Sequence, residues 1–188
     1  MTPHAPKTAL LVAVLLVHFS GSAQEKEEPV VPEHARHEVS LLIAHTGVSQ
    51  GLNVNGERGW LMLPSWGLNY NYWLSERWAI GLHTDLITET FVVTENHNEA
   101  EGEPEVERTR PIAPAIMASF RPHHHWAFTL GAGAEFAQEG DLFLMRAGTE
   151  YTIHLGGPWE TSGSFAYDLR SNAYDSYTLG IGITRTFR

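Results

Sequence analysis

The sequence contains no cysteine, which excludes disulfides, thiolate chemistry and a lipid anchor attached to cysteine. Basic residues are also scarce, with 12 Lys and Arg against 22 Asp and Glu and a formal net charge of −10. A nucleic-acid-binding protein usually presents a basic face, so this balance argues against nucleic acid as a partner. Beyond the N-terminal region there is no run of 18 or more apolar residues, so no membrane-spanning helix is predicted there.

The N-terminal region has the pattern of an export signal. Lys7 supplies a positive charge, and residues 9–17 (ALLVAVLLV) form an apolar segment that is too short to span a bilayer. Small residues just before Gln24 predict cleavage after Ala23, which makes residues 1–23 a signal peptide. We expect the charged, proline-bearing residues 24–36 to be a flexible periplasmic leader, and residues 37–188 to be the folded domain.

The last stretch, residues 176–188 (SYTLGIGITRTFR), alternates bulky and small side chains. The bulky ones are Tyr177, Leu179, Ile181, Ile183 and Phe187, and glycine or threonine stands between most of them. A period of two predicts a β-strand with two unlike faces. A soluble barrel would bury the bulky face, whereas a membrane barrel would turn it to lipid and its small face to a polar lumen.

Similar alternation predicts seven further strands. They cover residues 37–45, 60–73, 78–92, 111–120, 126–136, 142–155 and 159–170. The prediction is therefore an all-β fold, an eight-stranded antiparallel up-and-down transmembrane β-barrel. An even number of strands returns both chain ends to one side. The turns at 74–77, 121–125 and 156–158 are then periplasmic, and the connections at 46–58, 93–110, 137–141 and 171–175 are extracellular.

Aromatic residues favour lipid over water around this barrel. Five of them stand next to the predicted periplasmic turns or the C-terminus, namely Trp73, Trp78, Trp126, Trp159 and Phe187. Tryptophan prefers the membrane interface, so we expect these residues to form an aromatic belt at that level. A soluble exported β-barrel stays open as the alternative, because each strand signal is weak by itself.

With this pattern, residues 37–188 resemble the small eight-stranded bacterial outer-membrane β-barrels, among them the OmpA transmembrane domain and OmpX. The resemblance rests on the alternating strands and on Phe187 near the C-terminus. It implies residence in the bacterial outer membrane, contact with outer-membrane lipid and lipopolysaccharide, and insertion by the barrel-assembly machinery. It implies no particular activity, because one fold supports many functions.

The predicted inward face is rich in charge. It comprises Glu38, His83, Asp85, Glu89, Glu135, Arg146, Glu150, His154, Asp168 and Arg170. Because isolated buried charges are costly, we expect Arg146 and Arg170 to pair with the acidic side chains around them. Two interpretations remain, a plug of ion pairs that fills the narrow barrel or a gated passage for small polar solutes.

Catalytic signals are incomplete, and we expect neither a catalytic site nor a cofactor. The lipid A 3-O-deacylase family, also eight-stranded, carries a His-x-Ser-Asn-Ala stretch near its last outer loop. Residues 169–173 read Leu-Arg-Ser-Asn-Ala, so Ser171 lacks the histidine two residues before it. A serine without a nearby base is not an activated nucleophile.

Two polar segments invite a metal hypothesis. His123, His124 and His125 are consecutive in a turn, but a proper metal site needs converging ligands, so a solvated turn is the expectation. The acidic loop 95–107 makes divalent cations candidate partners, although it lacks the spacing of an EF-hand. The predicted function is a non-enzymatic outer-membrane barrel that supports the envelope or contacts its surroundings through extracellular loops. A narrow channel and a lipid A-modifying enzyme are the alternatives.

Overall fold

The computed structural model describes residues 37–52, 58–94, 105–171 and 173–187. The predicted signal peptide (1–23) and leader (24–36) lie outside the described residues. Ten strands are present, in chain order β1 (His37–Leu52), β2 (Arg58–Trp73), β3 (Trp78–Ile87), β4 (Thr90–Thr94), β5 (Glu105–Thr109), β6 (Ile112–His123), β7 (Trp126–Glu135), β8 (Leu142–Gly156), β9 (Trp159–Arg170) and β10 (Ser176–Phe187). In this part of the chain, no helix has the length and apolar character needed to cross a membrane.

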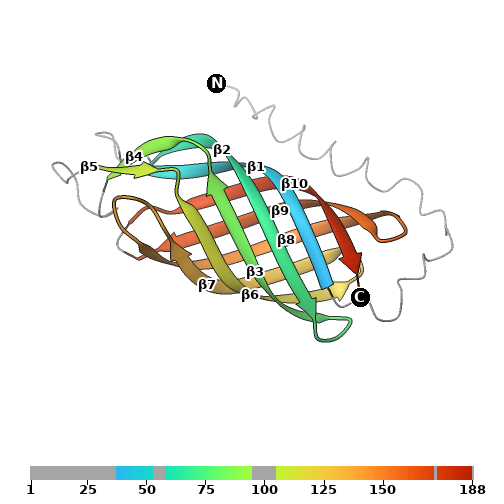
Figure 1. Cartoon of the computed structure of the whole chain (residues 1–188). Coiled ribbons are helices and arrows are strands. Elements are labelled where there is room, and N and C mark those ends of the chain that lie inside the picture. Colours follow the sequence, from blue (N-terminus) through green and yellow to red (C-terminus); the bar gives the residue numbers. More distant parts are fainter. Residues whose placement is uncertain (1–36, 53–57, 95–104, 172, 188) are drawn as a thin grey trace, which may run out of the picture. The chain divides into compact units, whose positions relative to one another are not determined.

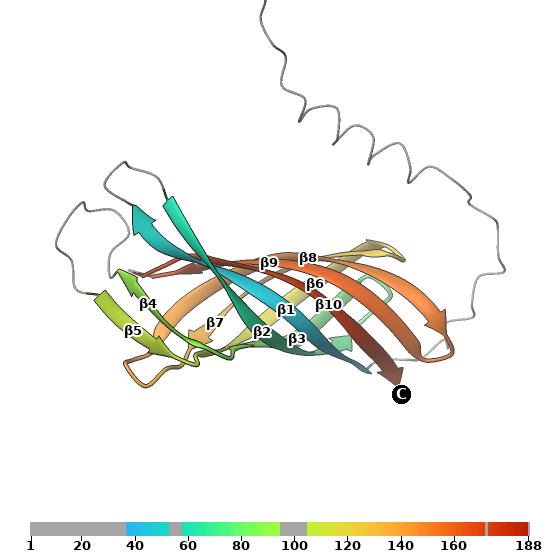
Figure 2. The same ribbon diagram turned by 90° about the horizontal axis from the view of Figure 1, so that it is seen from above.

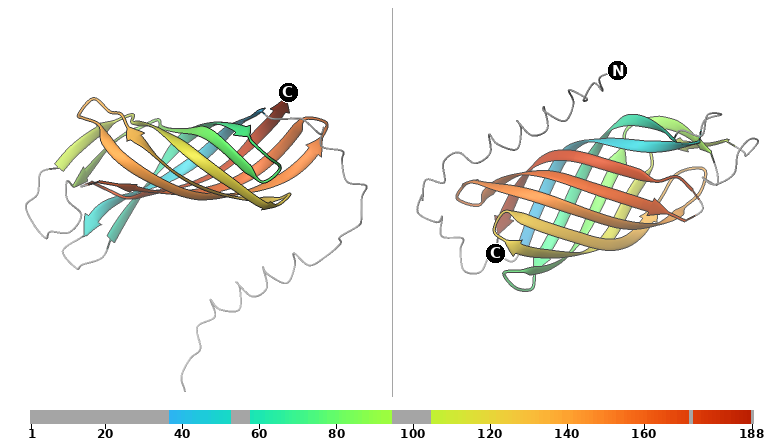
Figure 3. Two further views of the ribbon diagram at one scale, coloured as in Figure 1. Left: turned by 90° about the horizontal axis from the view of Figure 1, so that it is seen from below. Right: turned by 180° about the vertical axis from the view of Figure 1, so that it is seen from behind.

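Eight of the strands form one closed antiparallel barrel, in the order β1-β10-β9-β8-β7-β6-β3-β2 (Figures 1 and 3). The barrel closes where β1 pairs with β10, from His37 opposite Phe187 to Val48 opposite Ser176. Closure leaves no strand edge within the barrel wall, which is a requirement for a sheet in hydrocarbon. The predicted fold class, eight antiparallel strands in an up-and-down barrel, is confirmed.

Both ends of the barrel domain lie at one rim, because His37 and Phe187 are paired. The short turns after β2, β6 and β8 lie at that same rim, which we call the turn end (Figure 2). The connections after β1, β3, β7 and β9 lie at the opposite rim, the loop end. The grouping of turns and loops is as the sequence predicts.

The first hairpin is longer than predicted. The strand expected to end at His45 continues to Leu52, and β1 pairs with β2 as far as Leu52 opposite Arg58. Gly47 suggested a loop, but the ring of Tyr177 on β10 covers this glycine and would lie 2.5 Å from a Cβ placed there. An aromatic ring over a glycine in the neighbouring strand keeps the ladder intact.

The third predicted strand is divided. It was expected over residues 78–92, but β3 ends at Ile87 and β4 begins at Thr90. Between them, both the backbone N–H and the hydroxyl of Thr88 donate to the Pro64 carbonyl, each at 3.1 Å. β4 then leaves the barrel wall and pairs with β5, a strand inside the connection predicted to be a loop, while β6 takes the place next to β3.

Exposure shows which way the two faces of the wall point. Large apolar side chains are outside, for example Ile181, Leu130 and Ile116, which are 72%, 62% and 64% exposed. Charged side chains such as Glu135 and Arg146 are buried inside. The outward positions of β10 run from Tyr177 to Phe187, which is about 33 Å along a strand and about 25 Å along the axis of a barrel with strands tilted by roughly 40°. This height matches the apolar band of a transmembrane barrel, as the sequence predicts.

Ile181 lies near the middle of this outward band, so a charge there tests the orientation. We expect Ile181→Arg to destabilise the barrel by about 2–4 kcal/mol in lipid vesicles, because an arginine at the bilayer midplane is poorly solvated. Leu74→Arg, in the turn after β2, is the matched control and should cost less than about 1 kcal/mol. Unfolding by guanidinium measures both, and equal losses would contradict a lipid-facing Ile181.

Candidate functional site

The candidate site is the barrel interior, and its loop-end half is organised around Glu135. This residue ends β7 and is completely buried. Its carboxylate accepts hydrogen bonds from Arg108 on β5 (Nε, 3.1 Å), from Arg170 on β9 (Nε, 2.7 Å) and from the Tyr174 hydroxyl (2.6 Å). Three segments distant in the sequence are therefore fastened to one carboxylate.

The ion pairs continue from Arg170 toward the middle of the barrel. Arg170 contacts Asp168 at 3.3 Å, and Asp168 accepts two hydrogen bonds from Arg146, at 2.6 and 2.8 Å. Arg146 also pairs with Asp85 at 2.8 Å. With Arg108 and Glu135, this group of residues, the loop-end network, holds three arginines and three carboxylates, so its formal charges cancel. Complete pairing is what buried charges require in a low dielectric.

Arg108 is the member of this network that the sequence did not reveal. It stands in a segment predicted to be a loop, whereas in the structure β5 carries it back to the barrel mouth. Its second anchor is the Gly140 carbonyl, which accepts a 2.8 Å hydrogen bond from Nη1. Two features of the sequence could have indicated its role. Arg108 directly follows an acidic segment, and the predicted inward face has more acidic side chains than arginines.

An apolar cluster closes the barrel mouth above the loop-end network. Its buried members are Val48, Leu63, Ile87, Phe91, Val93 and Tyr174. Phe91 and Val93 come from β4, and the ring of Phe91 meets Tyr174 edge-on at 5.6 Å. Burial raises the pKa of Tyr174 above its usual value, so its hydroxyl stays protonated and donates to Glu135. The β4–β5 hairpin therefore covers the loop end both by apolar packing and through Arg108.

A contact between loops supports the hairpin from outside. The Thr109 hydroxyl donates to Glu139 at 2.7 Å, and the Thr109 N–H donates to the other oxygen of the same carboxylate at 3.2 Å. These hydrogen bonds lower the pKa of Glu139, because they stabilise the ionised carboxylate. Together with the Arg108–Gly140 contact, they join β5 to the connection after β7.

A second cluster, the turn-end cluster, surrounds Glu38. This buried carboxylate accepts hydrogen bonds from Asn71 (3.0 Å), from the Trp73 ring N–H (3.0 Å) and from Arg121 (3.2 Å). Arg121 also stacks over the Trp73 ring at 3.9 Å. His83 extends the cluster through a 2.9 Å contact between its Nε2 and the Asn71 amide oxygen.

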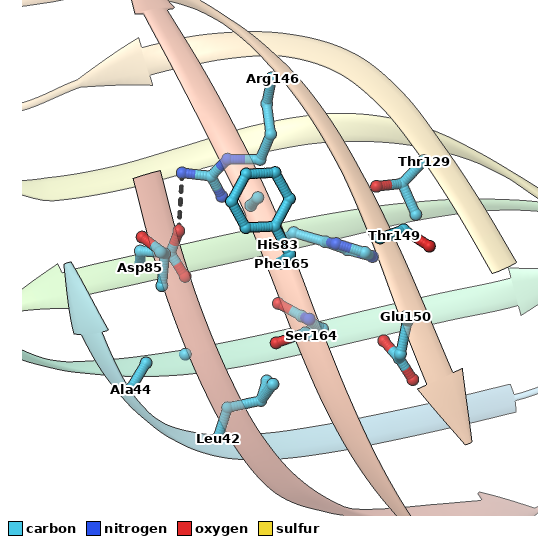
Figure 4. Close-up of a pocket in the computed structure, with 14 residues that line it drawn as sticks. Leu42, Ala44, His83, Asp85, Thr129, Arg146, Thr149, Glu150, Ser164 and Phe165 are labelled. Carbon is cyan, nitrogen blue, oxygen red and sulfur yellow. Dashed lines mark ion pairs between the residues drawn. The ribbon is translucent and has the colours of Figure 1, made fainter. Parts of the chain in front are cut away.

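A cavity of about 40 Å³ separates the two groups near mid-barrel (Figure 4). His83 and Asn69 line it from the turn-end side, Asp85 and Arg146 from the loop-end side, and Glu150 reaches it from β8. A second cavity of about 10 Å³ lies deeper in the loop-end half, beside Glu135, Asp168 and Arg170. These volumes hold isolated waters rather than a solute column.

Most of the residues predicted to point inward belong to the loop-end network or to the turn-end cluster. Seven of the ten, Glu38, His83, Asp85, Glu135, Arg146, Asp168 and Arg170, belong to the two networks, and Glu150 is buried at the cavity. His154 is partly buried near the turn end, with its Nδ1 3.4 Å from Glu160. Glu89 does not join them, because it is exposed in the bend between β3 and β4 where the barrel strand has already ended.

The turn-end rim carries an aromatic belt in which Trp73 has no part. Trp78, Trp126, Trp159 and Phe187 are between 41% and 52% exposed on the outer surface. Trp73 is only 9% exposed and points inward to Glu38, which corrects its predicted place at the interface. It directly follows the outward Tyr72, so strand alternation turns it to the lumen.

Belt residues also contact one another in pairs across the strands. Trp78 packs on Phe120, Trp126 on Tyr151, and Phe187 stacks on His37, with ring centroids 4.7, 5.0 and 5.6 Å apart. Aromatic pairs of this kind stabilise neighbouring strands beyond the area they bury.

The polar segments that suggested a metal site or a catalytic serine do not form either one in the described residues. No group of three or more histidine, aspartate or glutamate side chains there has the arrangement needed to hold a metal ion. His123, His124 and His125 are exposed at the turn between β6 and β7. The acidic loop lies outside the described residues at positions 95–104. Ser171 is exposed in the turn after β9, and Asn172 is not among the described residues.

No protein-family model and no curated protein matches the sequence. Solved structures are similar in fold. One is Ail, the attachment invasion locus protein of Yersinia pestis, in complex with the heparin analogue sucrose octasulfate, with a TM-score of 0.52 and 16% identity over 81% of this chain and 98% of that chain. Another is the outer membrane protein OprG from Pseudomonas aeruginosa, with a TM-score of 0.54 and 12% identity over 82% of this chain and 97% of that chain. The chain therefore has the fold of the small eight-stranded outer-membrane barrels.

The loop-end network predicts a large effect at Glu135. Glu135→Ala leaves Arg108, Arg170 and Tyr174 without their shared acceptor, and we expect a loss of about 3–5 kcal/mol in the free energy of unfolding. Glu107→Ala, exposed on the same hairpin as Arg108, is the control and should stay within about 0.5 kcal/mol. Both variants are measured by guanidinium unfolding in vesicles. A loss below about 1 kcal/mol at Glu135 would show that the network is not a structural centre.

Proposed function

We propose that this protein is a non-enzymatic component of the bacterial outer membrane, in which the barrel is an anchor and the loop-end hairpins contact the cell's surroundings. The observation that carries the proposal is the filled interior. Two ion-pair groups and an apolar cluster occupy the lumen, and the larger described cavity measures about 40 Å³. An interior of this kind suits a rigid support better than a passage.

The outer-membrane location has support from the surface of the barrel and from its fold. Bulky apolar residues cover the outside, and aromatic rings gather at the turn-end rim, where Arg185 lies over the Trp159 ring at 5.2 Å. An arginine beside an interfacial tryptophan reaches the headgroups from the edge of the apolar band. In this environment the partners of the barrel are outer-membrane lipid and lipopolysaccharide, and the barrel-assembly machinery during insertion.

The loop end carries the elements that such a protein would display. The β1–β2 pairing extends past the last β1–β10 pair, Val48 opposite Ser176, and reaches Leu52 opposite Arg58. The β4–β5 hairpin forms its own two-stranded sheet beyond the barrel wall. Because the short turns of outer-membrane barrels face the periplasm, the loop end faces the outside in this proposal. The Y. pestis Ail protein, of the same fold, is named for attachment and invasion.

The alternative functions have less support. A channel for small polar solutes is favoured by the polar lumen, but opening it would require the β4–β5 hairpin to leave Glu135 and the apolar cluster. A lipid A-modifying hydrolase is favoured only by the Ser-Asn-Ala sequence at 171–173, and Leu169 stands where the histidine is expected, two residues before Ser171. A serine nucleophile needs a base within hydrogen-bond reach.

Orientation can be tested directly because the sequence has no cysteine. We expect Glu107→Cys, on β5, to react with a bulky polyethylene glycol maleimide on intact cells. Glu76→Cys, in the turn after β2, is the matched control and should react only after the outer membrane is permeabilised. The reverse pattern of labelling would contradict the proposed orientation, and equal labelling before permeabilisation would contradict a membrane-spanning barrel.

Conductance separates the anchor from the channel. Reconstituted into planar bilayers, the wild-type protein should show no stable current steps, because ion pairs and the apolar cluster fill the lumen. Arg108→Ala combined with Phe91→Ala removes two of the attachments of the β4–β5 hairpin, one ionic and one apolar, and should raise the frequency of transient openings. Stable steps from the wild-type protein would overturn the anchor proposal in favour of the channel.

A further inference from the structure

The mid-barrel cavity contains a carboxylate that lacks a cation. Glu150, on β8, is 9% exposed and lines this cavity. Its carboxylate accepts hydrogen bonds from hydroxyl groups, among them that of Thr152 at 3.3 Å and that of Ser162. In the part of the chain that the structure describes, no lysine, arginine or histidine forms an ion pair with it. A buried carboxylate of this kind needs compensation from something else.

The nearby arginines are already neutralised. Arg146 reaches the cavity wall but is shared between Asp85 and Asp168 within the balanced loop-end network. Arg121, in the turn-end cluster, pairs with Glu38. Around the cavity, Glu150 is therefore the acidic side chain for which the described residues supply no ion-pair partner.

Neutral polar groups surround the same space. Asn69 lines the cavity and is 9% exposed, and none of the hydrogen bonds found among the described residues involves its side chain. Thr129 and Ser164 add hydroxyl oxygens to the wall, and Figure 4 shows both beside the cavity with Glu150. An amide and two hydroxyls next to one carboxylate are the ligands that hard cations prefer.

We propose that this cavity binds one small monovalent cation, Na⁺ or K⁺, with Glu150 as the charged ligand and Asn69 as a neutral one. A single uncompensated carboxylate matches a single positive charge. The absence of any suitable group of three histidine or acidic side chains in the described residues disfavours a transition metal or Ca²⁺ there. A volume of about 40 Å³ has room for the ion and roughly two waters.

This cation site is independent of the proposed surface role. Its consequence is stability, because an ion that binds only the folded barrel shifts the unfolding equilibrium toward the folded state. Two other occupants would compensate Glu150 differently. A proton would make stability depend on pH but not on the type of salt, and water alone would leave the charge in place.

The test compares wild-type protein with Glu150→Gln in detergent micelles, by heat-shift electrophoresis and circular dichroism, in NaCl, KCl and choline chloride at equal ionic strength. Choline is a bulky cation that oxygen ligands do not coordinate closely. At about ten times the dissociation constant of the ion, we expect Na⁺ or K⁺ to raise the wild-type Tm by about 3–6 °C over choline. Glu150→Gln, which is nearly isosteric, should lose this difference and should be at least as stable as wild type in choline.

Two additional measurements show whether the salt effect comes from the cavity. Glu107→Gln, at an exposed position on β5, should retain the full wild-type salt preference. The ²³Na NMR line should be broadened by wild-type protein and less so by Glu150→Gln or Asn69→Ala, which serves as the second variant if Glu150→Gln does not fold. A wild-type Tm that depends on pH but not on Na⁺, K⁺ or choline would overturn the proposal, and so would equal salt preferences in wild type and Glu150→Gln.

Discussion

The structure depends on one constraint, that charges inside a closed narrow barrel must find partners within it. Glu135 shows how the constraint is met, because a single buried carboxylate accepts hydrogen bonds from β5, β9 and the connection after β9. The loop-end network then balances its charges down to Asp85 at mid-barrel. Each arginine inside the barrel lies beside acidic groups, because burying an unpaired charge would cost on the order of several kcal/mol of desolvation free energy.

The need to pair buried charges also attaches the loop-end hairpin to the barrel wall. Arg108 completes the loop-end network from β5, so the β4–β5 hairpin is fixed over the mouth by charge as well as by Phe91 and Val93. The hairpin is thus part of the barrel's packing and not an independent appendage. A surface formed on such a support is presented in a defined position, which agrees with a role in contact rather than in transport.

The wall of the barrel could be predicted from the sequence because its signal is local. Alternation along residues 176–187 and along the other strands separates lipid-facing from lumen-facing side chains without any knowledge of pairing. Local pattern also explains the errors. The residue type of Trp73 and its place next to a turn predict the interface, although its position after the outward Tyr72 turns it inward to Glu38.

The interior and the loop end were less predictable because they depend on contacts between distant residues. Arg108 meets Glu135 across 27 positions because β5 returns the chain to the barrel mouth, where β7 ends. In the sequence Glu89 continues the alternation of β3, but the strand ends at Ile87 and Glu89 lies in the bend before β4, outside the barrel wall. The pairing of Arg146 with both Asp85 and Asp168 likewise needs three strands in register.

In a membrane-spanning barrel of this kind, the bulky apolar side chains contact hydrocarbon while the lumen excludes it. Magnetisation transfer from lipid acyl chains to side-chain methyl groups, measured by NMR in bilayers, tests this most directly. We expect strong transfer to the outward methyls of Ile181 and Ile116, and little transfer to the buried inward methyls of Met117 and Leu144. Strong transfer to Met117 and Leu144, with Ile181 and Ile116 contacting water, would contradict it.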